Sequence, residues 1–309
     1  MTPVDSAALL IEGPWQHRFV TANGARFHVA LSGPQDGPLV LLLHGVPQLW
    51  WAWRHQLPVL AAAGYRVAAM DLRGTGGSDK PPQGYDVPTL AADAAGVVRS
   101  LGAGSAVVVG AGTGGDVAWA TAAYQPDVVR AIGVLGSPHP LDAVAVPRTP
   151  PRLAASAVLA YAQLPSLPER AMTQGDLVDR MLTHWGGVPG LPDRLAVETY
   201  RRAARVPFAA HSQLEQVRWL VRSTPRPDGS RYRAILRAAR PVPVLQVHGL
   251  HDGLRPASGA ALRSGTTHVA RPYRFELLHG AGHYLPDQAP GIVGELLVDW
   301  LAEVDALSP

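Results

Sequence analysis

The sequence contains no cysteine and almost no lysine. Without a thiol in 309 residues, disulfides, thiolate nucleophiles and cysteine-ligated metals are all excluded. The lack of cysteine is compatible with the cytoplasm, which is where we expect the protein. Lys80 is the only lysine, so the basic side chains are nearly all arginines, and these are scattered with acids nearby. No basic stripe with interleaved aromatics is present, and we therefore expect no nucleic-acid partner.

Long apolar runs are missing as well. No stretch approaches the roughly 20 uncharged apolar residues of a membrane span, so we expect no membrane partner. Residues 1–14 carry no basic segment ahead of an apolar run, which argues against a signal peptide. What is present is 47% hydrophobic and 17% charged residues, the balance of a soluble globular protein. The length suits one large core with an inserted subdomain.

Short apolar runs alternate with amphipathic segments of helical length. Runs this short and this apolar are typical of strands buried on both faces of a parallel sheet. The alternation predicts an α/β fold with a mostly parallel, doubly wound sheet. Two opening segments, 16–21 and 26–31, indicate an antiparallel hairpin at one edge. The predicted buried strands are 39–43, 67–70, 106–109, 132–135, 242–247 and 273–278, and the predicted helices are 51–62, 89–101, 117–124 and 290–307.

The alternation breaks between residues 141 and 240. This stretch has many prolines and several helical patches but no strand-like run. We therefore predict a helical cap at 141–240, inserted into a core formed by 1–140 and 241–309.

Three segments follow predicted strands and carry glycines. His44-Gly45-Val46-Pro47 follows the first buried strand, and glycine there permits a sharp turn that would aim the Val46 amide into a pocket. The segment 71–79 is rich in glycine, and we interpret it as a structural turn held by an Asp71–Arg73 pair. The segment 109–115 joins a strand to a helix and has the spacing of a nucleophile elbow, G-x-Nuc-x-G.

In that third segment the central position is Gly112, flanked by Gly110 and Gly114. Glycine has no side chain that could attack a substrate. A misplaced elbow is one alternative, but strand, glycine spacing and helix all agree. A single laboratory substitution is another, but it would not account for the further departures described below.

The chain from about residue 15 to 301 resembles actinobacterial α/β-hydrolases of the epoxide hydrolase family. The matching segments are HGVPQLWWAWRHQLP (44–58), DLRGTGGSDKP (71–81), SPHP (137–140), HSQLEQVRW (211–219), the G-x-x-D of 249–252 and GAGH (280–283). The resemblance implies an α/β-hydrolase fold. It also implies an aspartate at the elbow that attacks an epoxide, and a histidine–acid pair that hydrolyses the resulting ester. In that family, two cap tyrosines hydrogen-bond the epoxide oxygen.

By this resemblance Asp252 is the acid and His283 is the histidine, and the amides of Val46 and Thr113 form the oxyanion hole. The departures all affect chemistry. Gly112 replaces the aspartate, and Ala111 replaces the histidine that usually precedes it. The two cap tyrosine positions fall on Val217 and Val158, with Tyr161 close enough to substitute for one of them.

For the other candidate residues, a structural role is possible as well as a functional one. Asp116 shares a helical face with Gly112, so it either enters the pocket or caps the helix. His44 and His139 follow family positions at the pocket wall and are more often hydrogen-bonded wall residues than proton carriers. Trp50 and its neighbours most often pack a helix against the core and cap. His248 and His251 flank the acid but lack further ligands in register, so we expect no metal.

Without a nucleophile the covalent route is closed, yet a base, its orienting acid and the oxyanion amides are still predicted. We expect an enzyme without a cofactor that uses a His283–Asp252 dyad as general base. The expected reaction is a cyclisation, an elimination or isomerisation, or direct addition of water on an apolar, polyketide-like small molecule. A ligand-binding pseudoenzyme is the alternative, and a hydrolase whose nucleophile is Asp116 is a third. A homodimer is compatible with the sequence.

Overall fold

A computed structural model of the chain describes residues 4–142, 150–190, 192–257 and 269–307. Within these residues, one eight-stranded sheet has the order β1-β2-β4-β3-β5-β6-β7-β8. β1 pairs antiparallel with β2, and β2 with β4, whereas the other neighbours are parallel. The predicted mostly parallel sheet with an edge hairpin is therefore confirmed. The strands are β1 (Gln16–Ala22), β2 (Ala25–Ser32), β3 (Leu39–Leu43), β4 (Arg66–Met70), β5 (Ala106–Ala111), β6 (Val129–Leu135), β7 (Val242–Gly249) and β8 (Val269–Leu278).

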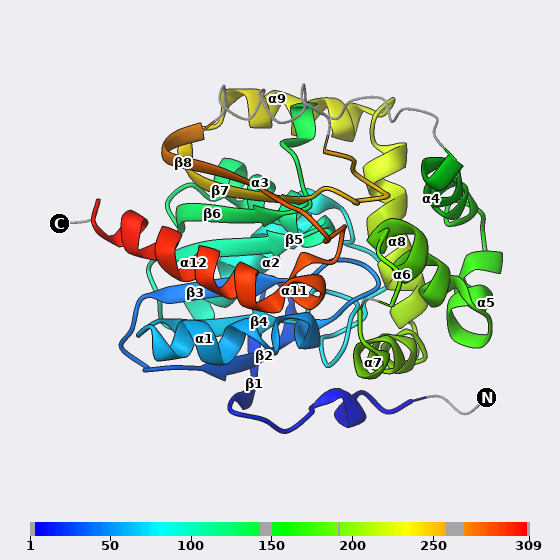
Figure 1. Cartoon of the computed structure of the whole chain (residues 1–309), viewed down its shortest axis with the longest axis horizontal. Helices are drawn as coiled ribbons and strands as arrows, with labels where there is room; N and C mark the ends of the chain where they lie inside the picture. The colour runs from blue at the N-terminus through cyan, green and yellow to red at the C-terminus, as the bar shows by residue number, and fades with distance from the viewer. Residues whose placement is uncertain (1–3, 143–149, 191, 258–268, 308–309) are drawn as a thin grey trace.

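Helices cover both faces of the sheet (Figure 1). α1 (Gln56–Ala62) and α12 (Pro290–Asp305) pack together on one face, and α2 (Val87–Ser100) and α3 (Thr113–Tyr124) pack together on the other. The predicted helix 51–62 is interrupted in the structure. Its first part is the 3-10 helix η2 (Trp50–Trp53), and α1 begins only at Gln56. Shorter elements are η1 (Ser6–Leu9), η3 (Pro140–Asp142) and α11 (Leu285–Gln288).

A helical insertion separates β6 from β7 in the chain, as predicted. Five of its helices gather beside one end of the sheet, while α9 runs along α3 and η3 (Figure 1). The helices are α4 (Pro150–Tyr161), α5 (Leu167–Gln174), α6 (Leu177–Gly186), α7 (Arg194–Ala204), α8 (Ala209–Arg222) and α9 (Pro227–Ala238).

The core follows from the alternation of side chains along each strand. In β3, Val40 and Leu42 belong to the apolar cluster beneath α1 and α12, and Leu41 and Leu43 belong to the cluster beneath α2 and α3. All five β3 residues are buried, which is why the strand reads as an uninterrupted apolar run. The first cluster continues into the insertion, so the cap and the core share one apolar interior.

In the described part of the chain, no helix combines the length and apolarity that crossing a membrane would require.

Candidate active site

A tight turn joins β5 to α3 at the carboxyl edge of the sheet. Gly112 occupies it with φ 55° and ψ −121°, a conformation that side-chain-bearing residues rarely adopt. The neighbouring glycines allow the close approach of strand and helix. A Cβ on Gly110 would lie 2.1 Å from the Gly114 carbonyl oxygen, and one on Gly114 would lie 2.4 Å from that of Leu43. The sharp turn predicted at this position is therefore present.

His283 and Asp252 meet at the same edge, although 31 residues separate them in the chain. The Asp252 Oδ2 atom lies 2.8 Å from Nδ1 of His283, and both residues are 3% exposed. The other carboxylate oxygen accepts the amides of Leu254 and Arg255, at 2.9 and 2.7 Å. Because a carboxylate can only accept, Nδ1 carries the proton, and a neutral His283 presents its lone pair at Nε2.

The Nε2 atom of His283 points at the turn. A Cβ on Gly112 would lie only 2.9 Å from it, and no described residue hydrogen-bonds to it. The space above Gly112 is therefore occupied by the imidazole edge.

The HG turn after β3 packs directly on this site. A Cβ on Gly45 would lie 2.9 Å from the Ala111 carbonyl oxygen and 3.5 Å from the Thr113 amide nitrogen. Within the described part of the chain, the amides of Val46 and Thr113 have no hydrogen-bond acceptor. Thr113 is also the first residue of α3, where the partial positive charge of the helix dipole is concentrated. Two free amides at this point can stabilise a negative oxygen.

The insertion closes over the dyad through α6. The ring of Trp185 lies edge-on to that of His283, with centroids 6.5 Å apart. The Trp185 carbonyl accepts the amide of Gly253 at 3.0 Å, which ties this helix to the loop that carries Asp252.

Asp116 lies in the first turn of α3, four residues after Gly112, but it is not joined to His283. Its carboxylate binds the Arg255 guanidinium through both oxygens, with one contact of 2.9 Å from Nη1 to Oδ1. Ser137 donates to the same Oδ1 at 3.1 Å. A helix-face pattern placed Asp116 near the elbow but gave no indication of this ion pair.

The histidines at the wall are fixed by hydrogen bonds. His44 donates from Nδ1 to the Gly45 carbonyl at 2.9 Å, and its Nε2 accepts the Leu72 amide at 3.1 Å. Burial lowers the pKa of His44, which keeps the ring neutral. His139 accepts the Leu141 amide at Nδ1 and stands edge-on to the ring of Trp119.

Trp50 lies on the side of the N-terminal hairpin. Its indole donates to the Leu9 carbonyl at 3.0 Å, and its ring contacts those of Trp15, His17 and Trp51.

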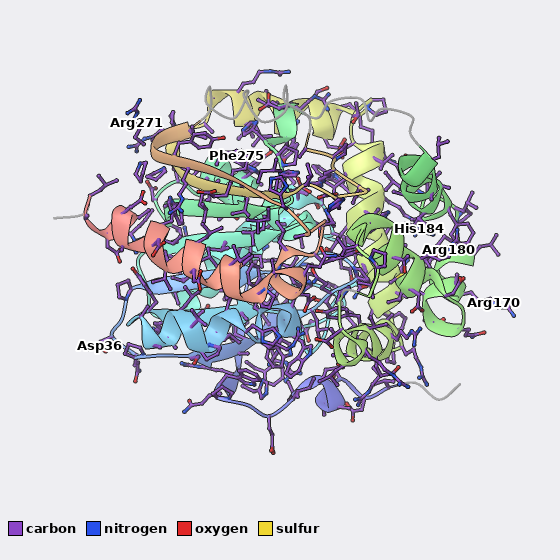
Figure 2. The ribbon with its side chains drawn as sticks, viewed as in Figure 1. Asp36, Arg170, Arg180, His184, Arg271 and Phe275 are labelled. Carbon is purple, nitrogen blue, oxygen red and sulfur yellow. The ribbon has the colours of Figure 1, made fainter. Side chains whose placement is uncertain are left out.

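At the cap positions, Val158 and Val217 are buried in the same apolar cluster as Val46 and Trp185. Tyr161 lies elsewhere. Its hydroxyl donates to the Leu167 carbonyl at 3.3 Å, and its ring packs under Arg180. Arg180 is on the outer flank of the insertion (Figure 2).

The Asp71–Arg73 pair that we expected in the glycine-rich turn does not form. Asp71 accepts from His28 at 2.8 Å and from the amides of Trp50 and Gly77, both at 2.9 Å. Burial alone would raise the pKa of Asp71, but the hydrogen bond and charge of His28 outweigh it, so the pKa is lowered. Arg73 instead pairs with Asp93 of α2.

Sequence reasoning also missed Arg255, Ser137 and Tyr232 around Asp116. Ser137 stood within a recognised motif and Arg255 lay three residues after the acid, but no local pattern paired them. Among the described residues, no group of three or more histidines and carboxylates is placed to hold a metal.

Comparison with known proteins places this arrangement in a family. Residues 38–290 match the family described as alpha/beta hydrolase fold. The chain belongs to the α/β-hydrolase family. Its strand order, inserted helices and carboxyl-edge site are then the family scaffold.

Within the α/β-hydrolase family the chain is epoxide hydrolase-like. It is 32% identical to Epoxide hydrolase 3 of Xenopus tropicalis over 96% of this chain and 81% of that one. It is 31% identical to Epoxide hydrolase A of Mycobacterium tuberculosis over 93% and 98% of the two chains. A solved structure of a putative epoxide hydrolase from Pseudomonas aeruginosa superposes with a TM-score of 0.80, 29% identity and 99% coverage of both chains.

Proposed function

We propose that this α/β-hydrolase is an enzyme without a cofactor, in which Gly112 stands at the nucleophile position and His283 acts as general base. The observation that carries the proposal is the direction of the imidazole. Its Nε2 faces the turn at Gly112, which carries no side chain that could receive or give a proton. A base without a protein nucleophile to activate must take its proton from the substrate or from water.

The proposed reaction begins when an O–H or C–H bond of the substrate breaks and its proton moves to Nε2. Asp252 stabilises the imidazolium through the hydrogen bond to Nδ1. The electron pair left on the substrate is stabilised as an oxyanion by the amides of Val46 and Thr113. That pair then closes a ring, expels a leaving group or returns to another carbon, and Nε2 gives the proton back. Direct addition of water uses the same groups.

The apolar surroundings of the dyad support an apolar, polyketide-like small molecule as substrate. Val158, Val217 and Trp185 of the insertion share one buried apolar cluster with Val46 and Ala111 of the core. Val158 and Val217 have no hydroxyl, so neither of these two cap positions can protonate an opened epoxide.

The alternative in which Asp116 serves as nucleophile has less support. Both of its carboxylate oxygens are held by Arg255, and an attacking carboxylate needs a free oxygen directed at the substrate. A ligand-binding pseudoenzyme is the second candidate, since a sealed apolar interior also suits binding alone.

The proposal is tested with 5-nitrobenzisoxazole, a small aromatic probe that opens to a phenolate when a base removes the C–H proton of its isoxazole ring and the N–O bond breaks. We expect turnover by the wild type and a loss of about a hundredfold or more in His283→Ala. Asp252→Asn should also lose rate, because an amide no longer holds the productive tautomer.

His279→Ala is the matched control, because His279 is exposed and follows β8 just before the same loop. Its rate should equal that of the wild type. Equal rates in His283→Ala and wild type would refute the general base, and binding of the probe without turnover in all proteins would favour the pseudoenzyme.

A further inference from the structure

A second polar cluster lies next to the dyad and has no role in the chemistry above. Asp116 of α3, Ser137 after β6 and Arg255 after β7 converge there. Arg255 Nη1 donates to Asp116 Oδ1 at 2.9 Å and to Ser137 Oγ at 2.7 Å, and Nη2 donates to Asp116 Oδ2. Burial would lower the pKa of Arg255, but Asp116 outweighs it, so the guanidinium stays charged.

One edge of this guanidinium is unused. Arginine has five N–H donors, and the three contacts above occupy those along the Nη1–Nη2 edge and the outer Nη1 proton. The Nε–H and the remaining Nη2 proton point the same way and form a two-donor edge. No described residue accepts from it, and 20% of the side-chain surface is exposed, against 5% for Asp116. A bound molecule can therefore reach the free edge.

Two other buried groups near this cluster lack partners. The hydroxyl of Tyr232 on α9 is sealed from solvent with no hydrogen bond in the described part of the chain. Burial raises its pKa, and the charge of Asp116 raises it further, so the phenol keeps its proton. His248 donates from Nε2 to the Arg255 carbonyl at 2.9 Å, and its Nδ1 has no described partner. Buried polar groups are normally satisfied, so these unpaired atoms beside the cluster indicate a further hydrogen-bonding partner.

The cluster is joined to the catalytic residues through Asp252. The Arg255 amide donates to Asp252 Oδ1, and His283 donates to Oδ2 of the same carboxylate. Ser137 follows Gly136, where a Cβ would lie 3.3 Å from Asp252 Oδ2 and 3.4 Å from His283 Nδ1. A group bound at the free edge is thus held on the same framework as the base.

The charges decide what kind of group fits. Asp116 and Asp252 carry two negative charges against the single positive charge of Arg255, so a further carboxylate would be repelled. A neutral oxygen with two lone pairs accepts both N–H groups without adding charge.

We propose that the free edge of Arg255 binds a carbonyl oxygen of the substrate, so that the enzyme acts on a ketone, ester or amide. This inference rests on the proposed function and identifies its substrate class. Asp116 is the residue that sets the charge preference of the edge.

The test is a binding comparison by ligand-observed NMR with three naphthalene probes: 2-acetonaphthone, 2-naphthoate and 2-ethylnaphthalene. The wild type should bind the ketone about tenfold or more tighter than either of the others, since two charge-assisted hydrogen bonds are at stake. In Asp116→Asn the guanidinium loses its counter-charge, and the preference should move to 2-naphthoate. Asp116→Asn/Arg255→Met leaves no unpaired charge and should bind the ketone and the hydrocarbon alike.

Arg170→Met is the control, because Arg170 lies exposed on the outer side of the insertion (Figure 2) and should leave every preference unchanged. The same titrations in His283→Ala should keep the ketone preference, so a failure of the general base is distinguishable from a failure of this site. A ketone that binds no better than 2-ethylnaphthalene in wild type, or an unchanged order in Asp116→Asn, would overturn the proposal and leave ordered water as the partner of the free edge.

Discussion

Gly112 combines two constraints that a side chain would violate. Its backbone is at φ 55°, and a Cβ there would approach His283 Nε2 to 2.9 Å, closer than such atoms pack in folded proteins. The imidazole therefore leaves too little room for the first side-chain atom of any larger residue. Gly112 and His283 are packed against one another, so a larger side chain at position 112 requires a change in the position of His283 as well.

We predict that Gly112→Ala destabilises the protein by about 1–3 kcal/mol and displaces His283, because strain and clash act together. Thermal unfolding measures the first effect, and a crystal structure of the variant measures the second. Gly112→Asp should likewise show no epoxide hydrolysis.

Gly102→Ala separates the two causes. Gly102 has φ 82°, and a Cβ added there would have no atom within 4 Å, so the substitution adds backbone strain alone. A Gly112→Ala loss no larger than that of Gly102→Ala, with His283 unmoved, would show that the clash has no effect.

At the level of elements, the sequence predicted the strands correctly wherever all residues of a strand are buried. β3 and β5 are buried along their whole length, so their apolar runs predict them directly. The turn at Gly112 was predictable because glycine spacing reflects steric contacts within one strand–turn–helix unit. The break between η2 and α1 was not, since the tryptophans there continue a helix-like apolar pattern.

Side-chain partners were harder to predict than elements. His28 and Asp71 lie 43 residues apart, and Asp116 and Arg255 lie 139 apart. Such pairs form because the sheet order brings the ends of distant strands together. The spacing of residues within one segment does not predict which distant strands become neighbours. His283 and Asp252 were paired in advance only through a family resemblance.

The insertion is fastened to the core by α7 and α11. Tyr200 of α7 donates to Asp287 Oδ2 at 2.6 Å, and Gln48 donates to the same oxygen at 2.7 Å. Arg54 binds the other oxygen, and its Nη2 reaches Asp193, the N-cap of α7, at 2.8 Å. Burial raises the pKa of Asp287 despite these partners.

We predict that Tyr200→Phe costs about 1–3 kcal/mol in the free energy of unfolding, because a hydrogen bond to a buried carboxylate is lost. Urea denaturation gives the value. Tyr161→Phe is the matched control, since its hydroxyl makes a single 3.3 Å contact at the surface and should change stability by less than about 0.5 kcal/mol. Equal effects of the two substitutions would contradict the fastening role.

On the scale of the whole molecule, buried histidines make the fold sensitive to acid. Burial lowers the pKa of His44 and of His248 below their usual 6.5. Below pH 6.5 these two histidines therefore bind protons in the unfolded chain but not in the folded chain. The free energy of unfolding consequently falls as the pH falls. Asp71 has a lowered carboxyl pKa, so its contribution is lost only in stronger acid, below 3.8.

We predict that the free energy of unfolding declines between pH 7.5 and 5.5, and that His248→Gln reduces this decline. Each histidine that is protonated only in the unfolded chain lowers the free energy of unfolding by up to about 1.4 kcal/mol per pH unit below 6.5. Glutamine can keep the donor to the Arg255 carbonyl and gives up only Nδ1, which has no partner in the described residues. The measurement is urea denaturation at both pH values.

His251→Gln is the control, because His251 is exposed and its replacement should leave the decline as it is in the wild type. An identical decline in His248→Gln and wild type would mean that His248 takes up its proton in the folded state as readily as in the unfolded one, and the acid sensitivity would then belong to other groups.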